Sequence, residues 1–210
     1  KKKLESDNII WTRIGYFILS GSVLFIFLIF LRKHTPKITK SHKQLSFMFM
    51  WIVVFVYLVS WIESTDLISI YIVPFCIVPI VVRNFYDDIT ALFTHIVVVL
   101  MTSLVASIGF EFIFTQIMIG VIAVITNVKT RYWSRFFISV FDILLTYVIV
   151  FVGISMLHQG TWKLENWQEI RWILGSVFLT LLSYPLVPLL ERIFGYTSDI
   201  TLDELGHLDQ

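Results

Sequence analysis

Residues 136–157 read FFISVFDILLTYVIVFVGISML, an apolar stretch in which Asp142 is the one charged side chain. A helix needs roughly 20 apolar residues, with about 17–25 acceptable, to cross the hydrocarbon core of a bilayer. The stretch therefore predicts a membrane-spanning helix, and the same criterion selects six other segments. We expect spans at residues 11–31, 45–62, 67–82, 89–110, 112–128, 136–157 and 172–190.

The composition agrees with a membrane protein. Of 210 residues, 57% are hydrophobic and 15% are charged, whereas a soluble domain carries about 25% charged residues. The mean hydropathy is +0.83. A fold of this size could not hide 19 Phe and 7 Trp from water, so the composition excludes a water-soluble enzyme. A net charge of +1 also argues against nucleic acid as a partner, and the bilayer is the expected one.

Two of the expected spans are irregular. The span at 67–82 is short, and Pro74 and Pro79 interrupt it. The region 89–128 would extend to roughly 60 Å as one helix, at 1.5 Å per residue. We therefore expect it to divide into two spans at Gly109–Glu111.

The basic residues indicate the orientation of the bundle. One set of loops carries ten of them, and the opposite set carries Lys163 and Arg171. The ten are Arg32, Lys33, Lys37, Lys40, Lys43, Arg83, Lys129, Arg131, Arg135 and Arg192. Because basic loops stay in the cytoplasm, we expect an all-α seven-helix bundle with its N-terminus outside and its C-terminus cytoplasmic. Four basic residues on the expected outer side do not fit this orientation: Lys1, Lys2, Lys3 and Arg13. Such charges influence the orientation less if a long exported domain precedes them.

Three polar residues fall inside the expected spans, at a similar depth from the cytoplasmic side. They are His95, Asp142 and Tyr184. A charge at mid-membrane costs about 2.5–3.5 kcal/mol on insertion scales, so each one needs a reason. We hypothesise that the three form a buried polar layer, in which a His95–Asp142 pair responds to pH or to bundle motion. The alternative is a static hydrogen-bonded contact between helices.

Charged and polar residues also gather at both faces. Glu111 and Gln116 begin the fifth span at the expected outer face. The expected cytoplasmic face carries a charge cluster of Arg83, Asp87, Asp88, Arg131 and Arg135. The Asp87–Asp88 pair lacks a second acidic group at ligand spacing, so we expect no metal site there.

Four prolines lie within or beside the spans: Pro74, Pro79, Pro185 and Pro188. Each removes a backbone donor and bends a helix. Pro185 and Pro188 lie in the last span, which leads to the cytoplasmic C-terminus, so a kinked final helix is a candidate moving part. Proline is also frequent in membrane helices that do not move.

Catalytic motifs are absent from the sequence. It contains no Gly-rich phosphate loop, no Gly-x-Ser-x-Gly elbow and no His-Glu-x-x-His. None of the five histidines is followed by Asp, and the single Cys76 excludes an internal disulfide. We therefore expect no catalytic residue and no cofactor in this chain. A small transporter or ligand-binding bundle, with His95 and Asp142 along a path, remains an alternative.

The end of the sequence predicts a further domain. Residues 191–205 read ERIFGYTSDITLDEL, in which Gly195 can end the last membrane helix. Thr201 and Glu204 form a capping box that opens a new helix, whose apolar side has no partner in this sequence. The chain also begins at Lys1 without a Met or a signal pattern, so we expect a segment of a longer protein.

Residues 191–205 resemble the start of the cytoplasmic HD domain of bacterial seven-transmembrane HD phosphodiesterases. Two other stretches are similar to the membrane region of that family: RNFYDD at 83–88, which runs into TALFTH at 90–95, and GFEFIFTQ at 109–116. The resemblance covers roughly residues 70–210. The Phe-rich composition suggests the Bacteroidetes branch.

The resemblance implies a sensor domain outside the membrane and a metal-dependent cytoplasmic phosphodiesterase that hydrolyses cyclic di-AMP. Metal ions would then bind only in that HD domain. Residues 1–10 would end the extracytoplasmic linker, 11–194 would form the membrane domain, and 195–210 would begin the cytoplasmic linker. The chain would connect the two domains, as a homodimer in the bacterial inner membrane. A passive anchor and dimerisation module is the other alternative.

Overall fold

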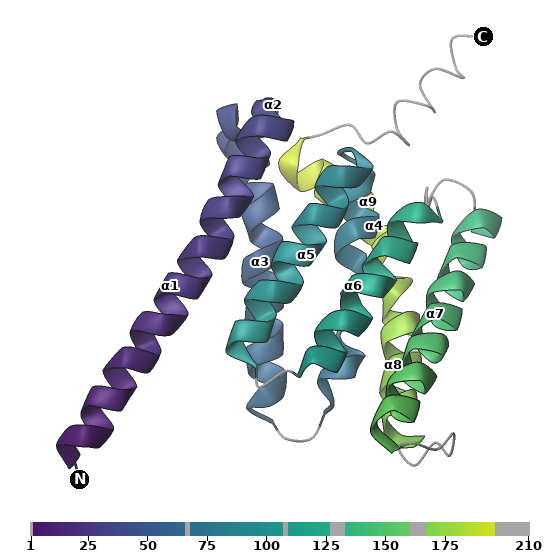
Figure 1. Cartoon of the computed structure of the whole chain (residues 1–210). Helices are drawn as coiled ribbons and strands as arrows, with labels where there is room; N and C mark the ends of the chain where they lie inside the picture. Colours follow the sequence, from purple (N-terminus) through teal and green to yellow (C-terminus); the bar gives the residue numbers. More distant parts are fainter. Residues whose placement is uncertain (1, 66–67, 107–108, 127–132, 160–166, 196–210) are drawn as a thin grey trace.

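The computed structural model describes residues 2–65, 68–106, 109–126, 133–159 and 167–195 (Figure 1). These residues form helices and contain no strand. The elements are α1 (Lys2–His34), α2 (Pro36–Lys40), α3 (His42–Glu63), the 3-10 turn η1 (Ile70–Ile72), α4 (Ile77–Arg83), α5 (Asp88–Val105), α6 (Phe110–Ile125), α7 (Trp133–Gln159), α8 (Trp167–Thr180) and α9 (Ser183–Phe194).

The helices account for the apolar segments of the sequence. Four of them, α1, α3, α5 and α7, are long and apolar enough to cross a membrane. The bent pair α8–α9 makes a fifth candidate, and α6 and the η1–α4 segment are shorter apolar helices. The all-α membrane bundle expected from the sequence is confirmed, and its third span differs from a regular helix.

The third span is broken in the middle. We expected one span at 67–82, but η1 ends at Ile72 and α4 begins only at Ile77. Pro74 lies in the gap, where it cannot donate a backbone hydrogen bond. Pro79 is the third residue of α4, and proline is tolerated there because the first amides of a helix have no partner within it. With seven residues, α4 is only about 10 Å long.

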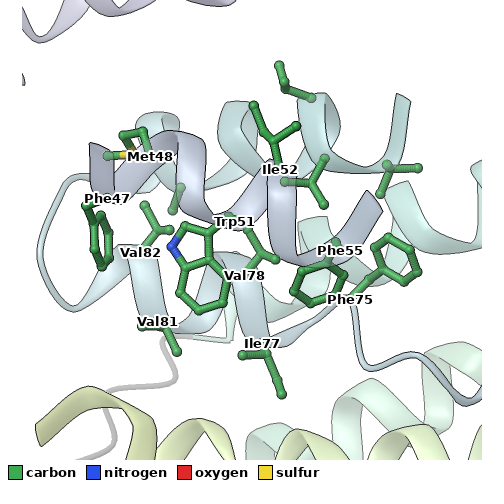
Figure 2. Close-up of a cluster of buried hydrophobic side chains, with 14 of the residues drawn as sticks. Phe47, Met48, Trp51, Ile52, Phe55, Phe75, Ile77, Val78, Val81 and Val82 are labelled. Carbon is green, nitrogen blue, oxygen red and sulfur yellow. The ribbon is translucent and has the colours of Figure 1, made fainter. Parts of the chain in front are cut away.

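The short helix α4 lies in the interior of the bundle. Its residues 77–82 are all buried. Figure 2 shows Val78 and Val82 beside Trp51 of α3, and Phe75 beside Phe55. The other faces of α4 are covered by α5, α6 and α9. A helix that is apolar all round is stable only when it is enclosed in this way.

The break frees backbone groups that must be satisfied inside the bundle. An unsatisfied backbone group in a bilayer costs several kcal/mol, and irregular backbone is tolerated only where protein surrounds it. Before the break, the Ser176 hydroxyl of α8 donates to the Val73 carbonyl at 3.2 Å. After it, the Asn84 amide donates to the Ile80 carbonyl at 2.7 Å, and Arg83 donates to the Val124 carbonyl of α6. Side chains of α4 and its neighbours therefore stabilise this segment.

The last span bends by 44° between α8 and α9. Pro185 has no N–H to donate to the Leu181 carbonyl, which accepts instead from the Tyr184 amide at 3.2 Å. The bend therefore immediately precedes Pro185, whereas α9 continues through Pro188 without a break. As expected, Gly195 ends the helix, with the left-handed φ of 66° that glycine adopts easily.

Helix α1 is attached to the bundle by only one of its halves. Phe27 and Phe30 stack on Phe93 of α5, with ring centroids 6.3 and 4.0 Å apart. The N-terminal half stands apart from the other helices in Figure 1, and Trp11 and Phe17 are largely exposed. Residues 2–10, which we expected to be linker, continue this helix.

Replacing Ser176 with Ala tests whether the break depends on its hydroxyl cap. We expect the free energy of unfolding to fall by about 0.5–1.5 kcal/mol, because the Val73 carbonyl keeps its bond from the Phe75 amide (2.9 Å) but loses the one from the Ser176 hydroxyl. Steric-trap unfolding in bicelles measures the difference. The matched control is Ser103→Ala, since that hydroxyl bonds only within α5. Equal effects of the two substitutions would contradict the role of the cap.

Candidate functional site

His95 is fully buried on α5 and makes a hydrogen bond to the neighbouring helix. Its Nε2 lies 2.8 Å from the main-chain carbonyl of Gln116 on α6. A carbonyl oxygen can only accept, so Nε2 carries a proton and donates. The bond fixes the position of α5 against α6 at the level of this carbonyl.

Gly120 allows the imidazole to approach α6 closely. It lies four residues after Gln116, on the same side of the helix. A Cβ atom built on Gly120 would overlap the His95 ring. The His95–Gln116 hydrogen bond therefore requires glycine at position 120.

The side chain of Gln116 extends the contact to α7. The Tyr147 hydroxyl donates to Gln116 Oε1 at 3.1 Å, and both residues are fully buried. Ser176 of α8, the cap of the broken span, also interacts with the Tyr147 hydroxyl. We call His95, Gln116, Tyr147 and Ser176 the polar core. It connects four helices with the break in the third span.

Two atoms of the polar core have no hydrogen-bond partner: His95 Nδ1 and Gln116 Nε2. The main-chain carbonyl of Phe75, within the break, also faces the imidazole. Buried polar groups are nearly always paired, so each unpaired atom requires an explanation. In the described structure, the hydrogen-bonding capacity of the polar core is therefore not fully used.

The structure places the other two residues of the expected polar layer away from His95. Asp142 is half-buried, and its backbone carbonyl accepts from the Thr146 hydroxyl at 2.8 Å. In the part of the chain that the structure describes, His95 and Asp142 share neither a hydrogen bond nor an ion pair. The inward face of α7 carries Ile143 and Tyr147 instead, because these residues lie four apart. Tyr184 packs on Phe136, with ring centroids 6.1 Å apart.

The two residues expected at the outer face, Glu111 and Gln116, lie in different surroundings. Glu111 lies in the first turn of α6, close to Gly109. Gln116 is fully buried and belongs to the polar core, so its assignment to the outer face is corrected. It lies one and a half turns further along α6, on the side that packs against α5 and α7.

The four prolines occupy two environments. Pro74 and Pro79 are buried in and just after the break, and Pro185 and Pro188 are exposed on α9. The bend before Pro185 separates the two helices of the last span, and Pro74 lies in the gap between η1 and α4.

The expected cytoplasmic charge cluster forms in part. Arg83 pairs with Asp88, with Nε–Oδ1 and Nη2–Oδ2 distances of 2.6 and 3.1 Å. His34, in the last turn of α1, donates from Nε2 to Asp87 at 2.9 Å. These pairs connect α1, α4 and α5 at one end of the bundle. Arg131 and the side chain of Arg135 lie outside the described residues.

Asp87 also caps the N-terminus of α5. Its carboxylate accepts from the Thr90 amide at 3.2 Å and from the Thr90 hydroxyl at 2.6 Å. Burial tends to raise the pKa of Asp87, but the hydrogen bonds from Thr90 and His34 outweigh it, so the pKa lies below its ordinary value. The ionised carboxylate is thus favoured at neutral pH.

Sequence reasoning missed three residues of this site: Gly120, Tyr147 and Ser176. Tyr147 could have been found from the apolar stripe of α7, whose buried members Phe136, Ile143 and Tyr147 follow helical spacing. Gly120 and Ser176 give no such signal, because their role depends on which helix lies opposite. Among the described residues, no group of three or more His, Cys, Asp or Glu could hold a metal ion.

Replacing Gly120 with Ala tests the close approach of His95. The added methyl displaces the imidazole, and overpacking of this kind costs about 1–3 kcal/mol. Thermal unfolding in detergent should show the loss, whereas Gly153→Ala should not, because a Cβ on Gly153 meets nothing within 4 Å. Combining Gly120→Ala with His95→Ala should restore part of the stability. If the double variant loses the sum of the two single effects, the contact is not the cause.

Replacing Asp87 with Asn tests the electrostatic part of the cap. Asn remains a good N-cap but cannot be ionised. Because the folded pKa is lowered, the charge stabilises the fold above the ordinary pKa of about 3.9, and this contribution disappears as pH falls through the folded pKa. We therefore expect Asp87→Asn to lower the thermal midpoint at pH 7, and this effect to shrink as the pH falls below about 3.9 and through the lowered pKa of Asp87. The exposed Glu63→Gln is the control, and a pH-independent effect of Asp87→Asn would refute the explanation.

Comparison with known proteins assigns a family to this bundle. Residues 10–198 match the family model described as "7TM receptor with intracellular HD hydrolase". No curated protein and no solved structure matches the chain. The family match covers most of the sequence, including the broken span, the polar core and the bent last span. The chain therefore belongs to the family of 7TM receptors with an intracellular HD hydrolase.

Proposed function

We propose that this chain is the membrane transmission module of a receptor. In this proposal a sensor domain outside the membrane precedes α1, and a cytoplasmic HD phosphodiesterase that hydrolyses cyclic di-AMP follows α9. The module itself performs no catalysis and passes a change in the sensor to the hydrolase. The family description supports the hydrolase, and the substrate is part of the proposal.

The observation that carries the proposal is the bent last span. Helix α9 leads directly toward the segment where the HD domain would begin, and a 44° bend separates it from α8. Its inner face packs against α4, and Phe194 lies edge-on to Phe47 of α3, with ring centroids 5.2 Å apart. A hinge at the bend allows α9 to move while α8 stays in the bundle.

The contacts define a route from the first helix to the last. Helix α1 holds α5 through Phe30, which stacks on Phe93, and through the His34–Asp87 pair. Helix α5 packs against α4, and its His95 belongs to the polar core beside the break. Helix α4 in turn contacts α9. A displacement of α1 therefore reaches α9 through elements that are in direct contact.

Transmission requires two states of the bundle that bind the sensor input differently. The unpaired His95 Nδ1 and Gln116 Nε2 support a second arrangement, because other partners would lower its free energy. We propose that the two arrangements of the polar core correspond to two positions of α9. In a homodimer, these positions would change how two hydrolase domains meet.

The orientation belongs to the same proposal. The positive-inside rule supports a cytoplasmic end that carries α2, the Arg83–Asp88 pair and the end of α9. The N-terminus of α1 would then lie outside the bacterial inner membrane.

Replacing Pro185 with Ala tests transmission through the bend. The new N–H can bond to the Leu181 carbonyl, so α8 and α9 should align. The readout is cyclic di-AMP hydrolysis by the full-length receptor, as the ratio of rates with and without its extracytoplasmic domain. We expect this ratio to move from its wild-type value toward 1 in the variant.

The control is Pro188→Ala, because α9 already runs through Pro188 without a break. It should keep the wild-type ratio. An unchanged ratio in Pro185→Ala, with unchanged basal hydrolysis, would refute transmission through the bend. Restoration of the ratio by an unrelated membrane anchor in place of the bundle would support a passive anchor instead.

A further inference from the structure

A crevice opens between α1, α2 and α3, along the C-terminal half of α1. Its volume is about 310 Å³, at the lower end of the range for small-molecule sites. It is lined by Phe25, Leu28, Ile29 and Arg32 of α1, Thr39 of α2 and Leu45 of α3. The polar core does not contribute to it.

The crevice exists because α1 uses another face to pack on the bundle. Phe27 and Leu31 are fully buried, whereas Phe25 and Ile29 are 65% and 47% exposed. The short helix α2 then turns the chain back into α3, and Thr39 of α2 and Leu45 of α3 line the crevice together with Arg32. The exposed side chains of Phe25 and Ile29 give the crevice an apolar wall.

The end of the crevice that Arg32 lines is basic. Arg32 is exposed, and it has no ion-pair partner within the described ranges. Residues 32–43 contain Arg32, Lys33, Lys37, Lys40 and Lys43 and no acidic residue. A cation beside an apolar channel matches a ligand with an anionic head and a hydrocarbon tail. Basic pockets between membrane helices are known to bind anionic lipid headgroups.

We propose that this crevice binds one anionic phospholipid from the leaflet that faces the basic loops. The phosphate contacts the Arg32 guanidinium, and one acyl chain lies along Phe25, Leu28 and Ile29. The positive-inside rule makes this leaflet the cytoplasmic one, which is also the leaflet that carries anionic surface charge. A second copy of this chain fits less well, because residues 32–43 would face an identical basic segment.

The lipid site predicts a headgroup preference that one arginine controls. Native mass spectrometry of the full chain, titrated with phosphatidylglycerol or with phosphatidylcholine of the same acyl chains, measures it. We expect one phosphatidylglycerol to be retained per chain, and Arg32→Gln to weaken its binding about fivefold. Lys37→Gln is the matched control, because Lys37 is an exposed cation of the same segment that does not line the crevice.

A second variant tests the apolar wall without changing charge. Ile29→Trp fills the crevice, so it should also reduce phosphatidylglycerol retention, and circular dichroism checks that the variant is folded. Inorganic phosphate in millimolar excess should not displace the lipid, because it lacks the acyl chain.

Three results would overturn the site. They are equal retention of the two lipids, equal losses in Arg32→Gln and Lys37→Gln, and displacement by inorganic phosphate alone. A mass twice that of the chain, lost in Ile29→Trp, would replace the lipid with a second copy of the protein.

Discussion

The bundle must satisfy the backbone at the break in its third span, where the Val73 carbonyl accepts from the Ser176 hydroxyl at 3.2 Å and from the Phe75 amide at 2.9 Å. A bilayer offers no water to free backbone groups, so irregular backbone at this depth must be enclosed and capped by protein. This constraint explains why residues 77–82 of α4 are all buried and why α8 lies against η1. It also explains why fully buried polar side chains, such as Ser176 and His95, lie beside the break.

The same constraint connects the polar core with the proposed movement. Tyr147 and Gln116 extend the capping network from α8 to α6 and α7, and His95 extends it to α5. Helix α9 packs against α4, which also packs against α5. A change in this network can therefore reach α9, where the last span leaves the bundle. A single regular helix in place of η1 and α4 would satisfy its own backbone groups, so it would not need the side chains of the polar core as caps.

The sequence predicted the helices better than their contacts. Hydropathy predicted the apolar helices, because a segment of about 20 apolar residues is long enough to cross a bilayer. Four of the described helices have this length, or five spans if the bent pair α8–α9 counts as one. Proline and glycine marked the break at Pro74 and the end of α9 at Gly195, since both act through the local backbone. The sequence also singled out His95, but it suggested Asp142 as the partner. Depth along a helix can be counted from the sequence, whereas the direction a side chain faces depends on how neighbouring helices are rotated.

The central claim is that the surrounding helices enclose residues 73–76 and that the Ser176 hydroxyl caps the Val73 carbonyl. Cys76 lies in this segment, so its accessibility tests the claim directly. It is the single cysteine of the sequence and is fully buried within the break. The decisive measurement is the rate at which N-ethylmaleimide labels Cys76 in membranes, for the unaltered chain and for Ser176→Ala. The account predicts strong protection in the unaltered chain and clearly faster labelling in the variant. Rapid labelling of the unaltered chain, or equal protection of both, would contradict it.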